Sequence, residues 1–294
     1  FIHVVFLLTL VGVLVSVVFK TLAFSSTYQH PVAATIGLIV AVLITGYGVW
    51  NARQIRVAAH DVVLSALPAA WEGKKLVLIS DVHVGAIWKK ERMEQLVAQI
   101  NAQQPQAVLM TGDIFDGPPT DYVAEIEPFA RIQAPLGSYF VNGNHERYRS
   151  NDPYVDALRQ RGVSVLGNDV VDLEGIQLIG VDYVSTTSME MKRELLANIP
   201  IQTERPSILL SHVPRFLEVA AERGISLQLS GHTHAGQLWP FTFLSAYVYE
   251  GYDRGLKAFG ALQVVTTQGA GTWGPPLRLG TQCEVVVTTL YRQV

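Results

Sequence analysis

The chain of 294 residues carries 22 Lys and Arg against 25 Asp and Glu, which gives a formal net charge of −3. Hydrophobic residues make up 49% of it and charged residues 16%. The composition is otherwise ordinary, and no basic patch suggests a nucleic acid as partner. A single cysteine, Cys283, excludes a disulfide bond within the chain and fits a buried structural thiol.

Two apolar runs at the start of the chain predict a transmembrane helical hairpin within residues 1–56. Residues 1–19 and 31–50 contain no Asp, Glu, Lys or Arg, and a short polar connector separates them. Each run is about long enough to cross a hydrocarbon core of roughly 30 Å. A signal peptide explains one run at most, and the alternative is a buried hairpin in a soluble domain. Because Phe1 opens in mid-run, we expect further residues before it.

The positive charges around these runs indicate an orientation. Arg53 and Arg56 follow the second run, and Lys74 and Lys75 come next, whereas the connector has only Lys20. Cytoplasmic segments carry an excess of Lys and Arg. We therefore expect residues 57–294 to form a catalytic domain on the cytoplasmic side of the membrane.

Helical and strand patterns alternate along residues 57–294, which are enough for one α/β domain. Amphipathic helices are predicted at Lys90–Gln103, Pro119–Arg131, Pro153–Arg161, Met189–Asn198 and Pro214–Arg223. Strands are predicted at Leu76–Ile79, Ala107–Met110, Ser138–Val141, Val163–Val165, Val170–Leu173, Ile176–Val181, Ile208–Leu210, Leu227–Leu229, Ala261–Thr267 and Glu284–Tyr291.

Five short clusters of polar residues each follow one of these strands. The clusters are Ser80–His83, Gly112–Asp113, Gly143–Glu146, Ser211–His212 and Gly231–His234. A hydrophobic strand that stops at a polar residue places that residue at the rim of a buried sheet, where ligands of α/β proteins gather. Scattered surface residues are the alternative, but five recurrences after strands argue against it.

The chemistry of the clusters indicates transition metals. Seven candidate ligands combine imidazole nitrogen with carboxylate and amide oxygen, namely Asp81, His83, Asp113, Asn144, His212, His232 and His234. Such a set suits Mn²⁺, Fe, Zn²⁺ or Co²⁺ better than Ca²⁺ or Mg²⁺. Seven ligands are too many for one catalytic ion and about right for two ions that share a carboxylate.

The order D-x-H, G-D, G-N-H-[D/E], H and G-H-x-H resembles the calcineurin-like metallophosphoesterase superfamily over about residues 74–290. The extended motif Ser230–Gln237 resembles a bacterial membrane-associated branch, which includes phosphodiesterases and a UDP-2,3-diacylglucosamine hydrolase type. The resemblance implies a four-layer αββα sandwich, two divalent ions with Mn²⁺ foremost, and a multi-pass protein of the bacterial inner membrane.

The resemblance also assigns roles residue by residue. One ion would be held by Asp81, His83 and His234, and the other by Asn144, His212 and His232, with Asp113 bridging the two. His145 would contact the phosphoryl oxygens or protonate the leaving group instead of binding metal. Two such ions lower the pKa of a bridging water, so the resulting hydroxide would attack phosphorus in line with the leaving oxygen.

Departures from sister families narrow the resemblance. Asp116 stands where purple acid phosphatases carry a Tyr, and Gly117 stands where Ser/Thr protein phosphatases carry an Arg. Glu146 and Ala235 replace a commoner Asp and a common Gly, and both changes look conservative. The phosphate-binding signature G-x-x-x-x-G-K-[ST] is absent, and Gly269–Gly271 is interpreted as a loop.

The segment Leu238–Tyr249 bears on the substrate. It has no charged residue, has five aromatic rings, and begins four residues after His234. We expect Trp239, Phe241 and Phe243 to form an apolar lip beside the metals, since aromatic rings favour the membrane interface. Packing as core strand and loop is the alternative. Residues 273–276 are expected to line the same mouth and Arg278 to contact a phosphate, although both have a structural alternative.

Two functions remain open at this stage. The first is a membrane-anchored hydrolase of a phosphodiester or pyrophosphate bond in a lipid or lipid precursor. The second is a tethered hydrolase of soluble phosphodiesters such as cyclic nucleotides. A non-catalytic membrane scaffold is a third class, but the complete ligand set argues against it. The sequence does not indicate an oligomeric state.

Overall fold

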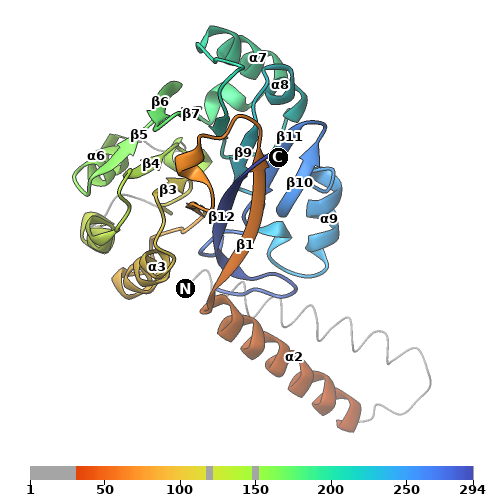
Figure 1. Cartoon of the computed structure of the whole chain (residues 1–294). Coiled ribbons are helices and arrows are strands. Elements are labelled where there is room, and N and C mark those ends of the chain that lie inside the picture. Colours follow the sequence, from red (N-terminus) through yellow and green to blue (C-terminus); the bar gives the residue numbers. More distant parts are fainter. Residues whose placement is uncertain (1–30, 117–121, 148–151, 294) are drawn as a thin grey trace.

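The computed structural model describes residues 31–116, 122–147 and 152–293. The first predicted membrane run, residues 1–19, lies outside them. The second forms the helix α2 (Pro31–Ala52), which projects away from the rest of the described chain (Figure 1). Its window Thr35–Ala52 has a mean hydropathy of 1.6, and within the described residues it alone is long and apolar enough to cross a membrane. The hairpin is therefore not confirmed.

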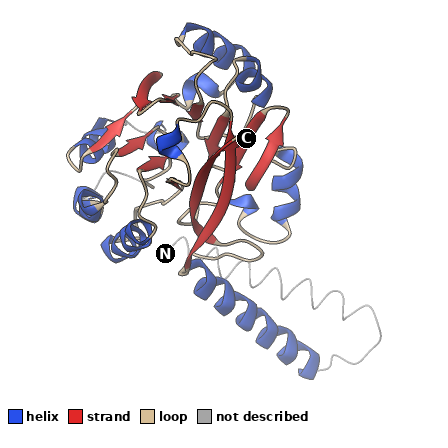
Figure 2. Cartoon of the chain, in the orientation of Figure 1, coloured by secondary structure: helices blue, strands red, loops and turns tan. Residues whose placement is uncertain are grey.

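Two six-stranded mixed sheets form the centre of the molecule (Figure 2). The first sheet has the order β1 (Ile55–Leu64), β12 (Cys283–Arg292), β2 (Lys75–Ile79), β3 (Ala107–Met110), β4 (Ser138–Phe140) and β5 (Val163–Val165). The second has the order β10 (Gly255–Phe259), β11 (Leu262–Thr266), β9 (Leu227–Ser230), β8 (Ser207–Leu210), β7 (Ile176–Gly180) and β6 (Asp169–Leu173).

Alternation along the buried strands sets the layers. In β2, Val77 and Ile79 pack toward helices, whereas Leu76 and Leu78 pack between the two sheets. The helices α3 (Lys90–Ala102) and α6 (Asp152–Arg159) cover the first sheet. The helices α7 (Met189–Asn198) and α8 (Leu217–Glu222) cover the second. The result is the predicted α/β sandwich with helices outside and sheets inside.

Several predicted elements differ from the structure. The strands predicted at residues 163–181 are divided between the sheets, because β5 ends the first and β6 and β7 end the second. The predicted helix Pro119–Arg131 is, in its described part, the short α4 (Tyr122–Glu125) and a 3₁₀ turn at Glu127–Arg131. Pro128 lies at the start of that turn and lacks the N–H that a continuous helix requires.

The strands β1 and β10 and the helix α9 (Phe241–Val248) were not predicted. Both strands are at sheet edges, where one neighbour is missing and charged residues interrupt the apolar pattern. The helix α9 has apolar residues on nearly every side, so it lacks the polar face that marks an amphipathic helix in a sequence.

The parallel strands place the polar clusters together. Strands β2, β3 and β4 are mutually parallel, as are β7, β8 and β9, so their carboxyl ends meet at one edge of each sheet. Short turns follow them, including α5 (Asn144–Arg147), η3 (Val184–Thr186) and η4 (His234–Gly236). All five predicted clusters therefore lie at the same edge of the sandwich.

The helix α2 is joined closely to this edge. The backbone N–H of Arg278 donates to the carbonyl oxygen of Gly48 at 3.0 Å. The buried amide of Asn51 donates to the carbonyl oxygens of Arg278 and Thr281 at 3.1 and 2.8 Å. Only residues 53 and 54 separate α2 from β1, which pairs in parallel with β12 along its whole length.

Candidate metal centre

Tight turns carry the candidate ligands. Five non-glycine ligands adopt positive φ angles, namely Asp81 (52°), His83 (53°), Asp113 (51°), His232 (71°) and His234 (47°). Each such residue costs on the order of 1–3 kcal/mol, and such strain clusters at functional sites. Backbone hydrogen bonds between neighbouring turns oppose this cost, because the N–H groups of Asp81 and His83 donate to the carbonyl oxygens of Gly112 and Asp113 at 3.0 and 3.1 Å.

The first ligand cluster contains Asp81, His83 and His234, all buried. The Nε2 atoms of the two histidines lie 3.1 Å apart, and Oδ1 of Asp81 lies 3.5 Å from Nε2 of His234. That oxygen has no hydrogen-bond partner although it is buried. A buried carboxylate oxygen without a partner is costly, and a cation at this point would supply one.

The second cluster contains Asp113, Asn144, His212 and His232. Nε2 of His212 lies 3.2 Å from Oδ2 of Asp113, 3.1 Å from Oδ1 of Asn144 and 3.1 Å from Nδ1 of His232. Asp113 also borders the first cluster, because its carbonyl oxygen accepts the N–H of His83. The structure thus brings all seven candidate ligands together, with Asp113 between the two clusters.

The electrostatics of the clusters fit bound cations. Burial raises the pKa of Asp81 to about 6 and lowers the pKa of His83 to about 4. Burial opposes charge on His212 too, but Asp113 outweighs it and raises the His212 pKa, while the His212 charge holds the pKa of Asp113 well below its usual range. The site therefore stabilises positive charge beside Asp113, and its donor set fits two divalent ions.

Two glycines allow the loops that carry the ligands to lie close together. A Cβ atom at Gly143 would collide with the carboxylate of Asp113, and one at Gly231 would collide with the side chains of Ser80 and Asp81. The glycines in the G-N-H and G-H-x-H motifs therefore make room for the ligands of neighbouring loops. Glycine is used where a backbone must come this close to another group.

Glu146 has a larger role than a conservative replacement suggested. Its side chain is fully buried and accepts the N–H groups of Asp113, Ile114, Phe115 and Gly143 at 2.8–3.2 Å. Four donors on one carboxylate hold the turn that carries Asp113. The residue thus supports the position of the central carboxylate.

His145 lies beside the ligands, and Asp116 orients it. Its Nδ1 is 3.2 Å from Oδ1 of Asp116, and its Nε2 is 4.0 Å from Oδ2 of Asp113. Burial lowers the His145 pKa, but the hydrogen bond to Asp116 and the charges of Asp113 and Asp116 outweigh this effect, so the pKa is raised overall. Sequence reasoning gave Asp116 no role, although its place three residues after Asp113 was a usable signal.

Arg278 is not free to contact a phosphate. Its side chain is fully buried, and its guanidinium donates to the carbonyl oxygens of Gln268 and Gly271 at 2.6 and 2.7 Å. It also lies 3.1 Å from Nδ1 of His234, on the side of the ring away from Asp81. Because Nη1 of Arg278 also donates to the backbone carbonyl oxygen of His234 at 3.3 Å, the expectation of a phosphate contact is replaced by support of the turn that carries His234.

We expect Arg278→Met to weaken metal binding by about 10–100-fold, because the turn that carries His234 loses the donor to its backbone carbonyl oxygen and the groups that support metal ligands typically contribute that much. Competition with a chelator measures the affinity. The matched control is Arg92→Met, because Arg92 is also buried and donates to the carbonyl oxygens of Arg53 and Ala270 but contacts no candidate ligand. Equal effects of the two substitutions would show general destabilisation.

The predicted lip is exposed. Trp239, Phe241 and Phe243 have exposed fractions of 64%, 53% and 68%. Together with other exposed apolar side chains on and near α9 they form what we term the aromatic patch, which contains Trp239, Phe241, Phe243, Leu244, Tyr247, Val248 and Trp273. Packing of these rings in the core, the alternative interpretation, is wrong. Residues 274–276 are partly buried and adjoin the patch through Trp273.

Three residues near the clusters were missed in the sequence. The ring of Tyr249, at the end of α9, has its centroid 6.2 Å from that of His232. The ring of Tyr183 lies 6.0 Å from that of His212. The guanidinium carbon of Arg215 lies 5.2 Å from the ring centroid of Tyr249. None of the three belongs to a motif, and only the packing of separate loops brings them here.

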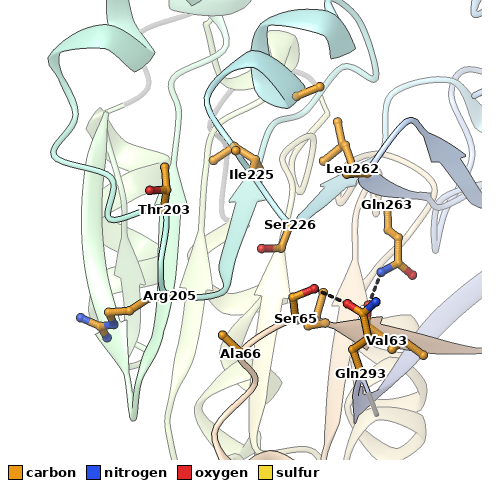
Figure 3. Close-up of a pocket in the computed structure, with 14 residues that line it drawn as sticks. Val63, Ser65, Ala66, Thr203, Arg205, Ile225, Ser226, Leu262, Gln263 and Gln293 are labelled. Carbon is orange, nitrogen blue, oxygen red and sulfur yellow. Dashed lines mark hydrogen bonds between the residues drawn. The ribbon is translucent and has the colours of Figure 1, made fainter.

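A cavity at the other edge of the sandwich lies away from this chemistry (Figure 3). It is lined by residues at the amino ends of the strands of the second sheet and by the end of β1, including Ser65, Thr203, Ser226, Leu262 and Gln263. The candidate ligands follow the carboxyl ends of the strands instead. The cavity therefore contributes nothing to the metal centre.

A mixed sandwich with seven His, Asp and Asn donors at the carboxyl ends of its strands is the architecture of a metal-dependent phosphoester hydrolase. Residues 74–236 match the model of the calcineurin-like phosphoesterases. The chain belongs to this family, whose members use a dinuclear site of divalent metal ions.

Relatives support the assignment. A metallophosphoesterase from Aquifex aeolicus is 31% identical over 262 residues, which cover 86% of this chain and 98% of that protein. A transmembrane protein with metallophosphoesterase domain from Danio rerio is 30% identical over 280 residues, covering 89% and 62%. A Helicobacter pylori metallophosphoesterase is 33% identical over 220 residues, covering 74% and 59%. The chain thus spans about three fifths of the length of the last two.

Among solved structures, a dimetal phosphatase from Danio rerio resembles this chain with a TM-score of 0.45 and 12% identity, covering 75% of this chain and 93% of that one.

Proposed function

We propose that this protein is a membrane-anchored phosphoesterase that hydrolyses a phosphodiester or pyrophosphate bond in a lipid or lipid precursor. The observation that carries the proposal is the position of the aromatic patch relative to α2. The backbone N–H of Trp239 donates to the carbonyl oxygen of Leu279 at 2.8 Å, and the same segment, residues 277–281, binds the end of α2. Residues 277–281 therefore hold both the aromatic patch and the end of the apolar helix α2.

The exposed surface of α2 agrees with a lipid environment. Its exposed apolar side chains include Ile36, Leu38, Ile39, Val42 and Leu43. A helix that is apolar on its exposed sides suits a membrane better than water. Tyr47 and Trp50 lie near its end, with ring centroids 5.9 Å apart, and such rings are enriched at the membrane interface.

We further propose that residues 1–19 supply a second spanning segment and that the catalytic domain faces the cytoplasm of a bacterial cell. The support is the sequence alone, namely the uncharged run and the basic residues Arg53 and Arg56. Mn²⁺ is the proposed metal, on the resemblance to the metallophosphoesterases, and the donor set of imidazole, carboxylate and amide oxygen suits it as it suits Fe, Zn²⁺ or Co²⁺.

The chain's own residues would divide the work. Asp81, His83 and His234 would hold one ion, and Asn144, His212 and His232 the other, with Asp113 shared. The bound ions supply an activated water and neutralise charge on the phosphoryl group. Asp116 fixes the imidazole of His145 through Nδ1, so that Nε2 is the atom that delivers a proton to the leaving oxygen. The aromatic patch would hold the apolar part of the substrate.

A turnover screen tests the proposal. Detergent-purified protein loaded with Mn²⁺ is offered lipid phosphodiesters, lipid diphosphates, cyclic nucleotides and a small chromogenic diester. We expect the lipid substrates to have the highest kcat/KM. A preference for cyclic nucleotides would favour a tethered enzyme with a soluble substrate, and the absence of any turnover would refute a hydrolase.

Replacement of Trp239, Phe241 and Phe243 by Ser should impair turnover of a lipid substrate far more than turnover of the chromogenic diester. Each methylene removed from water contributes about 0.8 kcal/mol, so the loss of apolar contact should raise the KM for a lipid strongly. The small ester needs only the metal centre and His145. The measurement is kcat/KM for both substrates in mixed micelles.

The matched control is Met191→Ser, since Met191 is an exposed apolar residue on α7, away from the patch. It should leave both substrates unaffected. Equal losses on both substrates in the triple variant would mean that the patch supports the fold, and no loss on either would mean that it does not meet the substrate.

A further inference from the structure

An exposed cation, Arg215, lies beside the metal centre. Arg215 follows His212 by three residues, on the loop between β8 and α8, and its side chain is exposed. Its guanidinium carbon lies 5.2 Å from the ring centroid of Tyr249, and that ring lies 6.2 Å from the ring of His232. Among the residues that the structure describes, no carboxylate forms an ion pair with Arg215.

A buried lysine fixes the backbone that carries Arg215. Lys192 of α7 is fully buried, and its Nζ donates to the carbonyl oxygens of Arg215 and Phe216 at 2.8 and 3.1 Å. A third bond joins Nζ to Oε1 of Gln228 at 3.3 Å. Phe216 adopts a left-handed φ of 53°. Three hydrogen bonds from one buried ammonium therefore hold a strained loop in place.

Two tyrosines complete the surroundings of His232. Tyr249 lies on the side of Arg215, and the ring of Tyr183 lies 6.5 Å from the ring of His232. The N–H of Tyr183 donates to Oδ1 of Asn142 at 2.9 Å, which fixes the loop after β7. Tyr183 follows β7 and Tyr249 follows α9, and their ring contacts with His232 place both tyrosines beside the metal ligands.

We propose that Arg215, held against Tyr249, binds a second phosphoryl group next to the one that is cleaved, so that the preferred substrate is a diphosphate ester. This inference deepens the proposed function and rests on it. A guanidinium binds phosphate oxygens through parallel hydrogen bonds, and stacking on an aromatic ring leaves its N–H groups free to do so. The scissile phosphoryl group needs the metal ions, and the contact with Tyr249 places Arg215 near His232, one of their candidate ligands.

Binding of two phosphoryl groups does not by itself specify the alcohol that is esterified to the second one. A diphosphate of a nucleoside and a diphosphate of a simple alkyl alcohol present the same two phosphoryl groups to the site. Dependence on Arg215 should be shared by both. The substrate with the higher kcat/KM would identify the preferred alcohol, and the ratio of kcat/KM between the two should be the same with and without Arg215.

The test compares Arg215→Gln with the unmodified full chain, loaded with Mn²⁺ in detergent. The substrates are bis(4-nitrophenyl) phosphate, a nucleoside diphosphate ester and an alkyl diphosphate ester. We expect kcat/KM for both diphosphates to fall about 10–100-fold, the size of a lost hydrogen bond to a charged group. The loss should lie mainly in KM, and the single phosphodiester should change by less than about threefold.

Two further variants control the comparison. Arg215→Lys keeps the charge but loses the planar fork, so it should recover only part of the diphosphate activity. Arg193→Gln removes an exposed arginine that pairs with Glu222 on the outer helices, and it should leave kcat/KM for all three substrates unchanged. Equal losses of kcat/KM in Arg215→Gln on the single phosphodiester and on the two diphosphate esters would overturn the proposal. No loss on any of them would overturn it too.

A binding measurement separates this inference from the proposed function. Methylenediphosphonate cannot be hydrolysed, and its affinity for the Mn²⁺-loaded protein should fall in Arg215→Gln, whereas that of inorganic phosphate should not. Any withdrawal of Mn²⁺ by the diphosphonate is common to both proteins. If no ester is hydrolysed but binding of the diphosphonate depends on Arg215, the proposed subsite is supported and the proposed hydrolase function is refuted. Binding independent of Arg215 would overturn the subsite.

Discussion

His145→Ala should bind both metal ions and yet lose about 10²–10⁴-fold in kcat on a substrate with a poor leaving group, the usual contribution of a general acid. The reason is that His145, although it forms a third group of potential ligands with His83 and Asp116, is not among the seven residues assigned to the two ions, and its Nε2 lies 4.0 Å from Oδ2 of Asp113. The measurements are metal content by elemental analysis and steady-state rate. Full activity on such a substrate would rule the role out.

A pH profile distinguishes an acid from a structural residue. Asp116 contributes to the raised pKa of His145 through its hydrogen bond and charge, so His145 stays protonated to higher pH than it would alone. In Asp116→Asn this support is lost and the pKa of His145 falls. The alkaline limb of kcat/KM should therefore move to lower pH. A limb that stays in place would show that His145 is not the group that titrates.

Asp113→Asn should reduce bound Mn²⁺ from close to two equivalents toward one and remove most of the activity. Asp113 lies between the clusters, within 3.2 Å of His212, and its carboxylate is the charge that stabilises a cation beside it. A neutral amide cannot bridge two cations with comparable strength. Elemental analysis after Mn²⁺ loading and desalting gives the stoichiometry.

The control for Asp113→Asn is Asp182→Asn. Asp182 lies on the loop after β7 and accepts a hydrogen bond from Asn142, but it belongs to neither ligand cluster. That variant should keep two equivalents. A stoichiometry of one in the unmodified protein, unchanged by Asp113→Asn, would contradict a dinuclear centre.

The sequence was sufficient for much of the fold and for the ligand set, because both depend on local patterns. Buried parallel strands such as Ala107–Met110 are short runs of apolar residues, and five of the strands are followed within a few residues by a ligand. The parallel arrangement then places the ligands at one edge. Edge strands such as β1 were missed, since charged residues such as Arg56 and Asp61 interrupt the apolar run.

The residues that support the ligands were predicted less well, because their contacts join distant parts of the chain. Arg278 reaches His234 across 44 positions and was expected to bind phosphate. No spacing rule brings Arg215 to Tyr249, since the loop after β8 meets the end of α9 only in the folded protein. A lone arginine outside a motif gives no signal of its partner, so only the structure distinguishes the buried one from the exposed one.

The two-residue junction between α2 and β1 limits how the catalytic domain can move. With residues 53 and 54 alone between them, and Asn51 bonded to residues 278 and 281, the domain has no flexible tether with which to search for substrate. If α2 spans a bilayer, the metal centre stays at one height above the headgroups. A scissile phosphate must then project to that height, so the distance between phosphate and acyl chain becomes a determinant of which lipids are hydrolysed.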